Sequence, residues 1–266
     1  MKTFALLALA ALPAFAQGAA KGKTEVTWYG HAAFVVKTPG GTTLAIDPWI
    51  NNPANKDKGA MEKIQKLDYI LISHGHFDHV GDAVELQKKT SAKIVSVFEL
   101  GAQLVAAAGV PKEAAGFETL GNAGGVLKLN DEVTVALVPA VHSSGFQASD
   151  SGPILYGGLP LGFVIQVKGG PTFYHTGDTA YFSEMKQIGE RFHPDVLLAC
   201  IGGHFTMDPL DAALAAHDTG VRSVVPMHFG TFPVLTGTPE QFAKALKTSA
   251  PKAKMVQMQV GETRAF

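Results

Sequence analysis

The stretch SHGHFDHVG, residues Ser73–Gly81, directly follows the apolar run YILI of residues Tyr69–Ile72. The apolar run predicts a buried β-strand. The polar stretch then lies at the carboxyl end of this strand, where the side chains of an α/β protein converge on a ligand. We therefore take this stretch as the centre of the fold and interpret the rest of the chain from it.

The spacing within the stretch favours metal binding. His74 and His76 are two residues apart, so both point the same way in an extended segment, and Gly75 between them allows another backbone to approach closely. Asp78 and His79 fall where the chain turns into a predicted helix; adjacent residues in a turn point in different directions and suit a second ion. Imidazoles and a carboxylate together fit a divalent metal such as zinc.

The length, composition and net charge of the chain limit the classes of function that it can have. The chain has 266 residues, enough for one large domain or two small ones, and its 46% hydrophobic content supports a sizeable core. The formal net charge is −1 and the sequence has no run of Lys or Arg, which disfavours a nucleic-acid partner. We expect a small-molecule substrate, and the sequence leaves the oligomeric state open.

Residues 1–20 are predicted to be a signal peptide with a short linker, and residues 21–266 the folded domain. A basic start is followed by the apolar segment Phe4–Leu12 and by Ala14-Phe15-Ala16, a cleavage site of the A-x-A type. Cleavage after Ala16 implies a periplasmic or secreted protein without a stable membrane anchor. Cys200 is the single cysteine, so no internal disulfide can form, and its apolar flank predicts a buried thiol.

Further polar residues follow predicted strands. Asp47 comes after the strand predicted over Thr43–Ile46, where a carboxylate followed by Pro48 suits a turn. His142 follows the strand over Val133–Val138, Asp178 follows Pro171–His175, and His228 follows Val221–Val225. By strand alternation His175 points away from Asp178.

The segment Ser143–Leu161 is rich in Ser and Gly and has no periodic apolar pattern. We expect a structureless loop that is either a flap over the site or a surface excursion. The helix after the ligands is expected over Gly81–Lys89 and a last strand over Lys254–Val260. Residues 24–140 and 141–266 each contain strands followed by alternating strands and helices, which predicts an α/β protein made of two mixed sheets packed face to face with outer helices.

The motif His-x-His-x-Asp-His of His74–His79 resembles the metallo-β-lactamase superfamily. Asp47-Pro48, Gly177-Asp178-Thr179 and His228-Phe229-Gly230 are similar to its other motifs, and the chain resembles the small metal-dependent hydrolase branch that is also similar to the ascorbate-phosphate lactonase group. The resemblance implies an αββα four-layer sandwich. It also implies that Asp47 steadies the metal-binding loop by hydrogen bonds, as the alternative to a simple turn residue, and that His31 lies near the site, as the alternative to a structural histidine. It implies that one metal is held by His74, His76 and His142 and the other by Asp78, His79 and His228, with Asp178 bridging both.

The implied chemistry is hydrolysis. Two divalent ions, Zn²⁺ by preference with Mn²⁺ or Fe²⁺ as alternatives, would hold a water molecule that loses its proton and attacks an ester, lactone, amide or phosphoester of a small molecule. Asp78 counts among the catalytic residues. We also expect His204, after the strand over Val196–Cys200, to donate a hydrogen bond to the oxyanion or to protonate the leaving group; otherwise it packs under the flap or supports Asp178. Some relatives have Asn at the position of His204.

Three other functions compete with hydrolysis of a small molecule. Redox enzymes of the flavodiiron type share the fold, but their motif resembles a pattern with Glu at the position of His76. No flavodoxin-like domain follows in this sequence either, so both features disfavour a redox enzyme. Nuclease relatives insert a large domain before the last histidine, whereas 49 residues lie between Asp178 and His228. A non-catalytic metal-binding or interaction protein on the same fold stays open as the main alternative.

Overall fold

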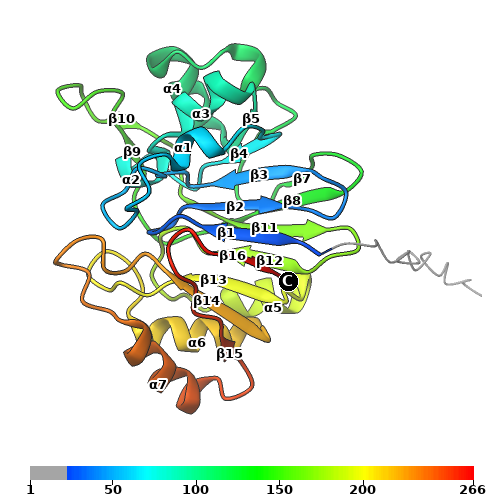
Figure 1. Cartoon of the computed structure of the whole chain (residues 1–266), viewed down its shortest axis with the longest axis vertical. Helices are drawn as coiled ribbons and strands as arrows, with labels where there is room; N and C mark the ends of the chain where they lie inside the picture. Colours follow the sequence, from blue (N-terminus) through cyan, green and yellow to red (C-terminus); the bar gives the residue numbers. More distant parts are fainter. Residues whose placement is uncertain (1–22) are drawn as a thin grey trace, which may run out of the picture.

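The computed structural model describes residues 23–266, so the predicted signal peptide lies outside the described residues. Two mixed β-sheets lie in the middle of the molecule, and helices cover the outer face of each (Figure 1). This is the four-layer arrangement that the sequence predicts. The core between the layers is a continuous cluster of buried apolar side chains contributed by both sheets.

The first sheet has the strand order β16-β1-β2-β3-β4-β5-β6. Its strands are β1 (Glu25–Trp28), β2 (Phe34–Lys37), β3 (Thr43–Ile46), β4 (Tyr69–Leu71), β5 (Lys93–Val97), β6 (Leu120–Gly121) and β16 (Thr263–Ala265). The neighbours from β16 to β3 pair antiparallel, and those from β3 to β6 pair parallel.

The second sheet repeats this plan with the order β15-β14-β13-β12-β11-β8-β7. Its strands are β7 (Val126–Lys128), β8 (Val133–Pro139), β11 (Leu161–Val167), β12 (Thr172–His175), β13 (Val196–Cys200), β14 (Ser223–Met227) and β15 (Lys254–Met255). Strands β7, β8, β11 and β12 pair antiparallel, whereas β12 to β15 pair parallel. All five residues of β13 are buried, as expected for a parallel strand covered on both faces.

The helices divide between the two outer faces (Figure 1). The first sheet carries α1 (Ala60–Lys63), α2 (Phe77–Val80), α3 (Ala83–Thr90), α4 (Phe98–Ala108) and the short 3₁₀ turn η1 (Lys112–Ala114), and the second carries α5 (Met185–Phe192), α6 (Pro209–Thr219) and α7 (Pro239–Ser249). Asp208 caps α6 by accepting hydrogen bonds from the N–H groups of Leu210 and Asp211, and Pro209 takes the first helical position, where its missing N–H costs nothing. Among residues 23–266 every helix is too short or too polar to span a bilayer.

The division between the two halves differs from the prediction. Strands β7 and β8 precede residue 141 in the chain but belong to the second sheet, and β16 brings the last part of the chain back beside β1. Residues 24–140 and 141–266 therefore do not each form one of the two sheets. The sequence shows where strands occur, but their assignment to one sheet or the other depends on pairing partners that are distant along the chain.

Three local predictions also need correction. The helix expected over Gly81–Lys89 is present as α3 but runs over Ala83–Thr90, and the short helix α2 precedes it. Gly81, with a φ of +38° and packed against the backbone of Trp49, lies between the two helices. The strand expected over Lys254–Val260 ends at Met255. The segment Ser143–Leu161 is not structureless, since β9 (Gly145–Phe146) and β10 (Leu155–Tyr156) pair antiparallel within it.

Candidate metal centre

Seven side chains converge at one edge of the two sheets, and they are the seven that the sequence analysis assigned to metal binding. His74 and His76 follow β4, Asp78 and His79 lie in α2, and three others follow strands β8, β12 and β14, namely His142, Asp178 and His228. The strands place these residues together because their ends meet at this edge.

Three histidines form the first group. The Nε2 atom of His74 lies 2.9 Å from Nδ1 of His76, and Nε2 of His142 lies 3.3 Å from the same atom. Two nitrogens that bind one tetrahedral zinc at its usual bond length are about 3.3 Å apart. The three nitrogens can therefore all reach a single ion, as the two-residue spacing of His74 and His76 predicts.

The second group contains Asp78, His79 and His228, together with His31. Asp178 lies between the two groups: its Oδ1 atom is 3.2 Å from Nε2 of His79, and its Oδ2 atom is 2.9 Å from Nε2 of His228 and 3.8 Å from Nε2 of His142. One carboxylate thus faces histidines of both groups, which is the geometry that a bridging ligand requires.

Several buried atoms of these side chains face one another at short range without forming a hydrogen bond of normal geometry. Nε2 of His79, Oδ1 of Asp178 and both ring nitrogens of His228 make no hydrogen bond to the described residues. Buried polar atoms in native proteins almost always have a partner, and an unpaired one costs free energy. Because these are nitrogen and oxygen atoms of ligand type that face one another, the residues fit divalent ions bound between them.

Hydrogen bonds behind the ligands fix their tautomers. The buried Asp47 carboxylate accepts hydrogen bonds from the backbone N–H of Ser73 (2.7 Å), from the hydroxyl of Ser73 (2.7 Å) and from Nδ1 of His79 (2.8 Å). The Ser73 oxygen in turn lies 3.0 Å from Nδ1 of His74 and accepts its proton. In their neutral forms both imidazoles therefore carry the proton on Nδ1, and the lone pair on Nε2 faces the centre. Burial opposes protonation of His79, yet the carboxylates of Asp178 and Asp47 raise the pKa of its ring well above the ordinary value, so a metal ion would displace the proton on Nε2. Asp47 is the hydrogen-bonding partner that the resemblance implied.

His31, whose role the sequence left open, belongs to this centre. Its Nε2 atom donates to Oδ2 of Asp78 over 3.0 Å, and Nδ1 lies 2.9 Å from the hydroxyl of Thr231. The residue has a φ of +50°, and His228, whose N–H donates to the His31 carbonyl, has a φ of +55°. Left-handed conformations are uncommon outside glycine and occur where the surroundings hold them in place, often at functional sites.

The electrostatics of the centre follow from burial and close contact. Burial lowers the pKa of His31 to about 4 and lowers the pKa of His74 well below its ordinary value. Burial opposes ionisation of Asp78, yet the hydrogen bond from His31 and the neighbouring His79 lower the pKa of that carboxyl to about 2. His74 and His31 are therefore neutral and Asp78 is ionised at neutral pH. These are the protonation states that bind metal.

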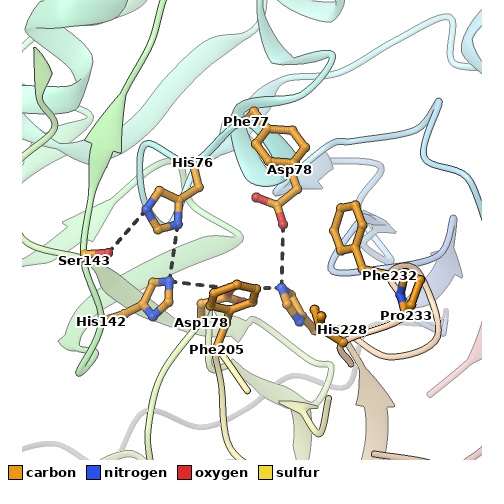
Figure 2. A pocket seen from close by; sticks show the side chains of 11 residues that line it. His76, Phe77, Asp78, His142, Ser143, Asp178, Phe205, His228, Phe232 and Pro233 are labelled. Carbon is orange, nitrogen blue, oxygen red and sulfur yellow. Dashed lines mark hydrogen bonds and ion pairs between the residues drawn. The ribbon is translucent and has the colours of Figure 1, made fainter. Parts of the chain in front are cut away.

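A cavity of about 680 Å³ opens onto the two groups. Figure 2 shows its floor formed by His76, Asp78, His142, Asp178 and His228, with aromatic rings around it. The remaining lining residues are Phe77, Ser143, Phe205, Phe232, Pro233 and Val234. The volume is in the range of sites that hold a small organic molecule.

The segment predicted as a flap lies directly against the metal-binding stretch. The N–H of Gly75 donates to the hydroxyl of Ser144, and a Cβ atom at Gly75 would come within 3.0 Å of the Gly145 carbonyl and of Phe146. Gly75 is thus needed for this close approach, as expected. The paired strands β9 and β10 hold the segment beside His142, and its movement over a substrate stays a prediction.

Two further histidines were assigned from the sequence. His175 is buried and hydrogen-bonds to the carbonyl of Ala32 and the N–H of Gly177, outside the two ligand groups, as strand alternation predicts. His204 has a φ of +58° and an exposed ring that packs edge-on against Phe205, and it is not among the residues that line the cavity. The loop after β13 presents Phe205 to the cavity instead, so the catalytic role of His204 stays a prediction.

Comparison with known proteins places this geometry in a family. Residues 42–229 match the family model described as "Beta-lactamase superfamily domain". The chain is 60% identical over 249 residues to a UPF0173 metal-dependent hydrolase of Anaeromyxobacter sp. (strain K), covering 93% of this chain and 89% of the relative. It is 47% identical to a UPF0173 metal-dependent hydrolase of Thermodesulfovibrio yellowstonii, covering 91% and 92% of the two chains. Igni18, a metallo hydrolase from Ignicoccus hospitalis, superposes with a TM-score of 0.78 at 38% identity over 92% of this chain and 99% of its own.

Proposed function

We propose a reaction for this chain from the premise that it belongs to the β-lactamase superfamily and, within it, to the UPF0173 metal-dependent hydrolases. The proposed reaction is hydrolysis of an ester, lactone, amide or phosphoester bond of a small molecule, with two divalent ions bound to the protein. The observation that carries this proposal is the convergence of seven ligand side chains on one edge, with buried nitrogen and oxygen atoms left unpaired between them. A purely structural metal site would not need the open cavity above them.

The first ion would be held by His74, His76 and His142, and the second by Asp78, His79 and His228, with Asp178 shared. Zinc fits best, because imidazole and carboxylate are its usual nitrogen and oxygen ligands. Bound there, the ions would lower the pKa of a water molecule and polarise the carbonyl or phosphoryl oxygen of the substrate.

The protein's own residues hold this arrangement rigid. Asp47 and Ser73 orient the rings of His79 and His74, and His31 orients the carboxylate of Asp78. Such hydrogen bonds keep the ligand lone pairs in place, so that little reorganisation is needed during the reaction. Phe77, Phe205 and Phe232 line the cavity beside these residues, and a substrate bound against them would exclude water from the reacting atoms.

Metal content per chain tests the two-ion arrangement. Wild-type protein loaded with zinc and freed of excess should contain two ions per chain, and His142→Ala or Asp78→Ala should retain one, because each removes a ligand of one group. His217→Ala is the matched control, since that exposed histidine pairs with Asp218 away from the centre, and it should retain two. Fewer than one ion in the wild type would refute metal binding, and a single ion unaffected by His142→Ala would refute the first group.

Activity is tested on the loaded protein with a panel of esters, lactones, β-lactams and phosphodiesters. The proposal requires at least one metal-dependent hydrolysis that His142→Ala abolishes and His217→Ala preserves. Full metal loading with no hydrolysis across the panel would favour the alternative of a non-catalytic metal-binding protein. For His204→Ala, a role as donor predicts retained metal and a rate loss of about a hundredfold; unchanged kinetics would remove His204 from the catalytic set.

We also propose that the mature protein starts near Gln17 and is exported. The support is the order of basic, apolar and small residues within the first sixteen positions. Intact-mass measurement on protein purified from its native host tests this, and an N-terminus at Met1 would contradict it.

A further inference from the structure

The wall of the cavity above the metal groups is apolar. Phe77 is 67% exposed, Phe205 57% and Val234 44%, and all three line the cavity together with Phe232. Figure 2 shows the rings of Phe77, Phe205 and Phe232 at the cavity. Exposed large apolar side chains gathered around a concave site indicate that an apolar ligand covers them. They come from three separate segments of the chain, namely α2, the loop after β13 and the loop after β14.

Part of this wall is held in a fixed position. The ring of Phe232 stacks on Trp49 with centroids 5.8 Å apart and an interplanar angle of 22°, and it meets Phe77 edge-on at 6.2 Å. Phe77 also meets Trp49 edge-on at 5.6 Å. Aromatic pairs at these separations stabilise one another. The three rings therefore form a preformed surface, which reduces the entropy lost when a ligand binds.

The ionised side chains that line the cavity are all acidic. Among the lining residues the ionised groups are the carboxylates of Asp78 and Asp178, and neither Lys nor Arg contributes a side chain. Proteins bind carboxylates and phosphates mainly through Arg and Lys. An anionic oxygen that develops on the scissile group has a partner at the metal groups, whereas a second anionic group of the substrate would find neither Arg nor Lys among the residues that line the cavity.

We infer that the substrate is an uncharged acyl compound, an ester or a lactone, with an apolar substituent that lies on the wall of Phe77, Phe205 and Phe232. This inference rests on the proposed function and narrows it. It disfavours phosphate monoesters, which carry two negative charges, and acyl compounds that carry a free carboxylate. The cavity volume leaves room for an alkyl chain or a ring beside the scissile group.

Three lactones that differ in a single substituent test the inference on the zinc-loaded full chain: γ-valerolactone with a methyl group, γ-nonalactone with a pentyl group, and 5-oxotetrahydrofuran-2-carboxylate with a carboxylate. We expect kcat/KM for the pentyl compound to exceed that for the methyl compound by about tenfold or more, because four further CH₂ groups leave water. The carboxylate compound should be about tenfold slower than the methyl compound.

Variants of the residues that line the cavity test whether the preference for the pentyl compound depends on the apolar wall. Phe205→Ala should remove most of the advantage of the pentyl compound through a higher KM, and it leaves the fold intact because the side chain is exposed. Phe117→Ala is the matched control: it is 85% exposed, stacks on Phe98 and lies outside the cavity, so it should change nothing. Val234→Lys should selectively raise kcat/KM for the carboxylate compound.

A second readout does not depend on turnover. The neutral aromatic probe N-phenyl-1-naphthylamine should gain fluorescence on binding to the metal-free full chain, and Phe205→Ala should weaken this binding where Phe117→Ala does not. Absence of probe binding, equal rates for the three lactones, or a preference for the carboxylate compound or for p-nitrophenyl phosphate would overturn the inference. If p-nitrophenyl phosphate alone were cleaved, the inferred substrate class would be refuted, but the proposed hydrolase function would still be supported. A protein that binds no metal would refute the proposed function, while the probe would still decide whether the wall binds apolar ligands.

Discussion

Replacing Asp47 by Ala should destabilise the protein strongly, even before metal is considered. The buried carboxylate accepts three hydrogen bonds, and its removal leaves the N–H of Ser73 and Nδ1–H of His79 without a partner in the core. Each unsatisfied buried donor costs about 1–3 kcal/mol. The hydroxyl of Ser73 can rotate toward another acceptor, so we do not count it.

The backbone adds to this cost. Asp47 has a φ of +43°, a left-handed conformation that Asp and Asn tolerate better than Ala, by about 1 kcal/mol. The sum for Asp47→Ala is about 3–7 kcal/mol, a large fraction of the stability of a typical domain, which is about 5–15 kcal/mol. Asp47→Asn keeps the backbone preference and one acceptor oxygen, and should lose about half as much.

The assay is urea unfolding of the metal-free full chain at neutral pH, with zinc affinity measured separately by competition with a chelating dye. Zinc affinity should fall by about 10- to 100-fold in Asp47→Ala, because His79 loses its orienting partner. Asp57→Ala is the control, since that exposed aspartate also accepts hydrogen bonds, from Gly59 and Lys63, and should change stability by about 0.5 kcal/mol. A loss below about 1 kcal/mol for Asp47→Ala would refute the reasoning.

Three further predictions follow from the same structure. Removing metal with a chelator should lower Tm by about 10 °C, since an ion present at a thousand times its Kd contributes about 4 kcal/mol, and an unchanged Tm would show that the centre is not loaded. The thiol of Cys200 should react with iodoacetamide at pH 8 only after unfolding, because burial raises its pKa to about 11 and keeps it protonated below that pH; rapid labelling of the native protein would contradict this. Gly177→Ala should destabilise by about 2–4 kcal/mol, because a Cβ atom would lie 2.5 Å from the Leu161 carbonyl at a φ of +60°. The matched control Gly109→Ala, with a φ of +73° and no neighbour within 4 Å of its Cβ, should cost only about 1 kcal/mol, and equal losses would exclude the clash as the cause.

The convergence of the seven candidate ligand residues could be predicted from the sequence because the apolar strands that precede them are clear. His74 and His76 after β4 and His228 after β14 are examples, and strand ends at one edge of a sheet bring such residues together. The role of His31 could not be predicted in this way. It depends on contacts with Asp78 and Thr231, which are 47 and 200 residues away, and on a left-handed backbone that no pattern in the sequence marks.

The aromatic wall was also missed. Phe77, Phe205 and Phe232 have no common spacing, and a single apolar residue in a loop cannot be recognised as exposed from the sequence. Strands of two or three residues, such as β6 and β16, escape detection because they are too short for an alternating pattern. The sheet to which β7 and β8 belong depends on long-range pairing, and local periodicity contains no information about it.

The position of β16 bears on the order in which this protein acquires its structure. Thr263 in β16 pairs with Thr27 in β1, at a separation of 236 residues, and their hydroxyl groups are within hydrogen-bonding distance. During synthesis the edge of the first sheet beside β1 stays open until nearly the whole chain has left the ribosome. The contact also closes a very long loop, which slows folding. Completion of the first sheet is therefore a late folding event: β1 can pair with β2 early, but its other edge stays unpaired while the C-terminal residues are still being translated.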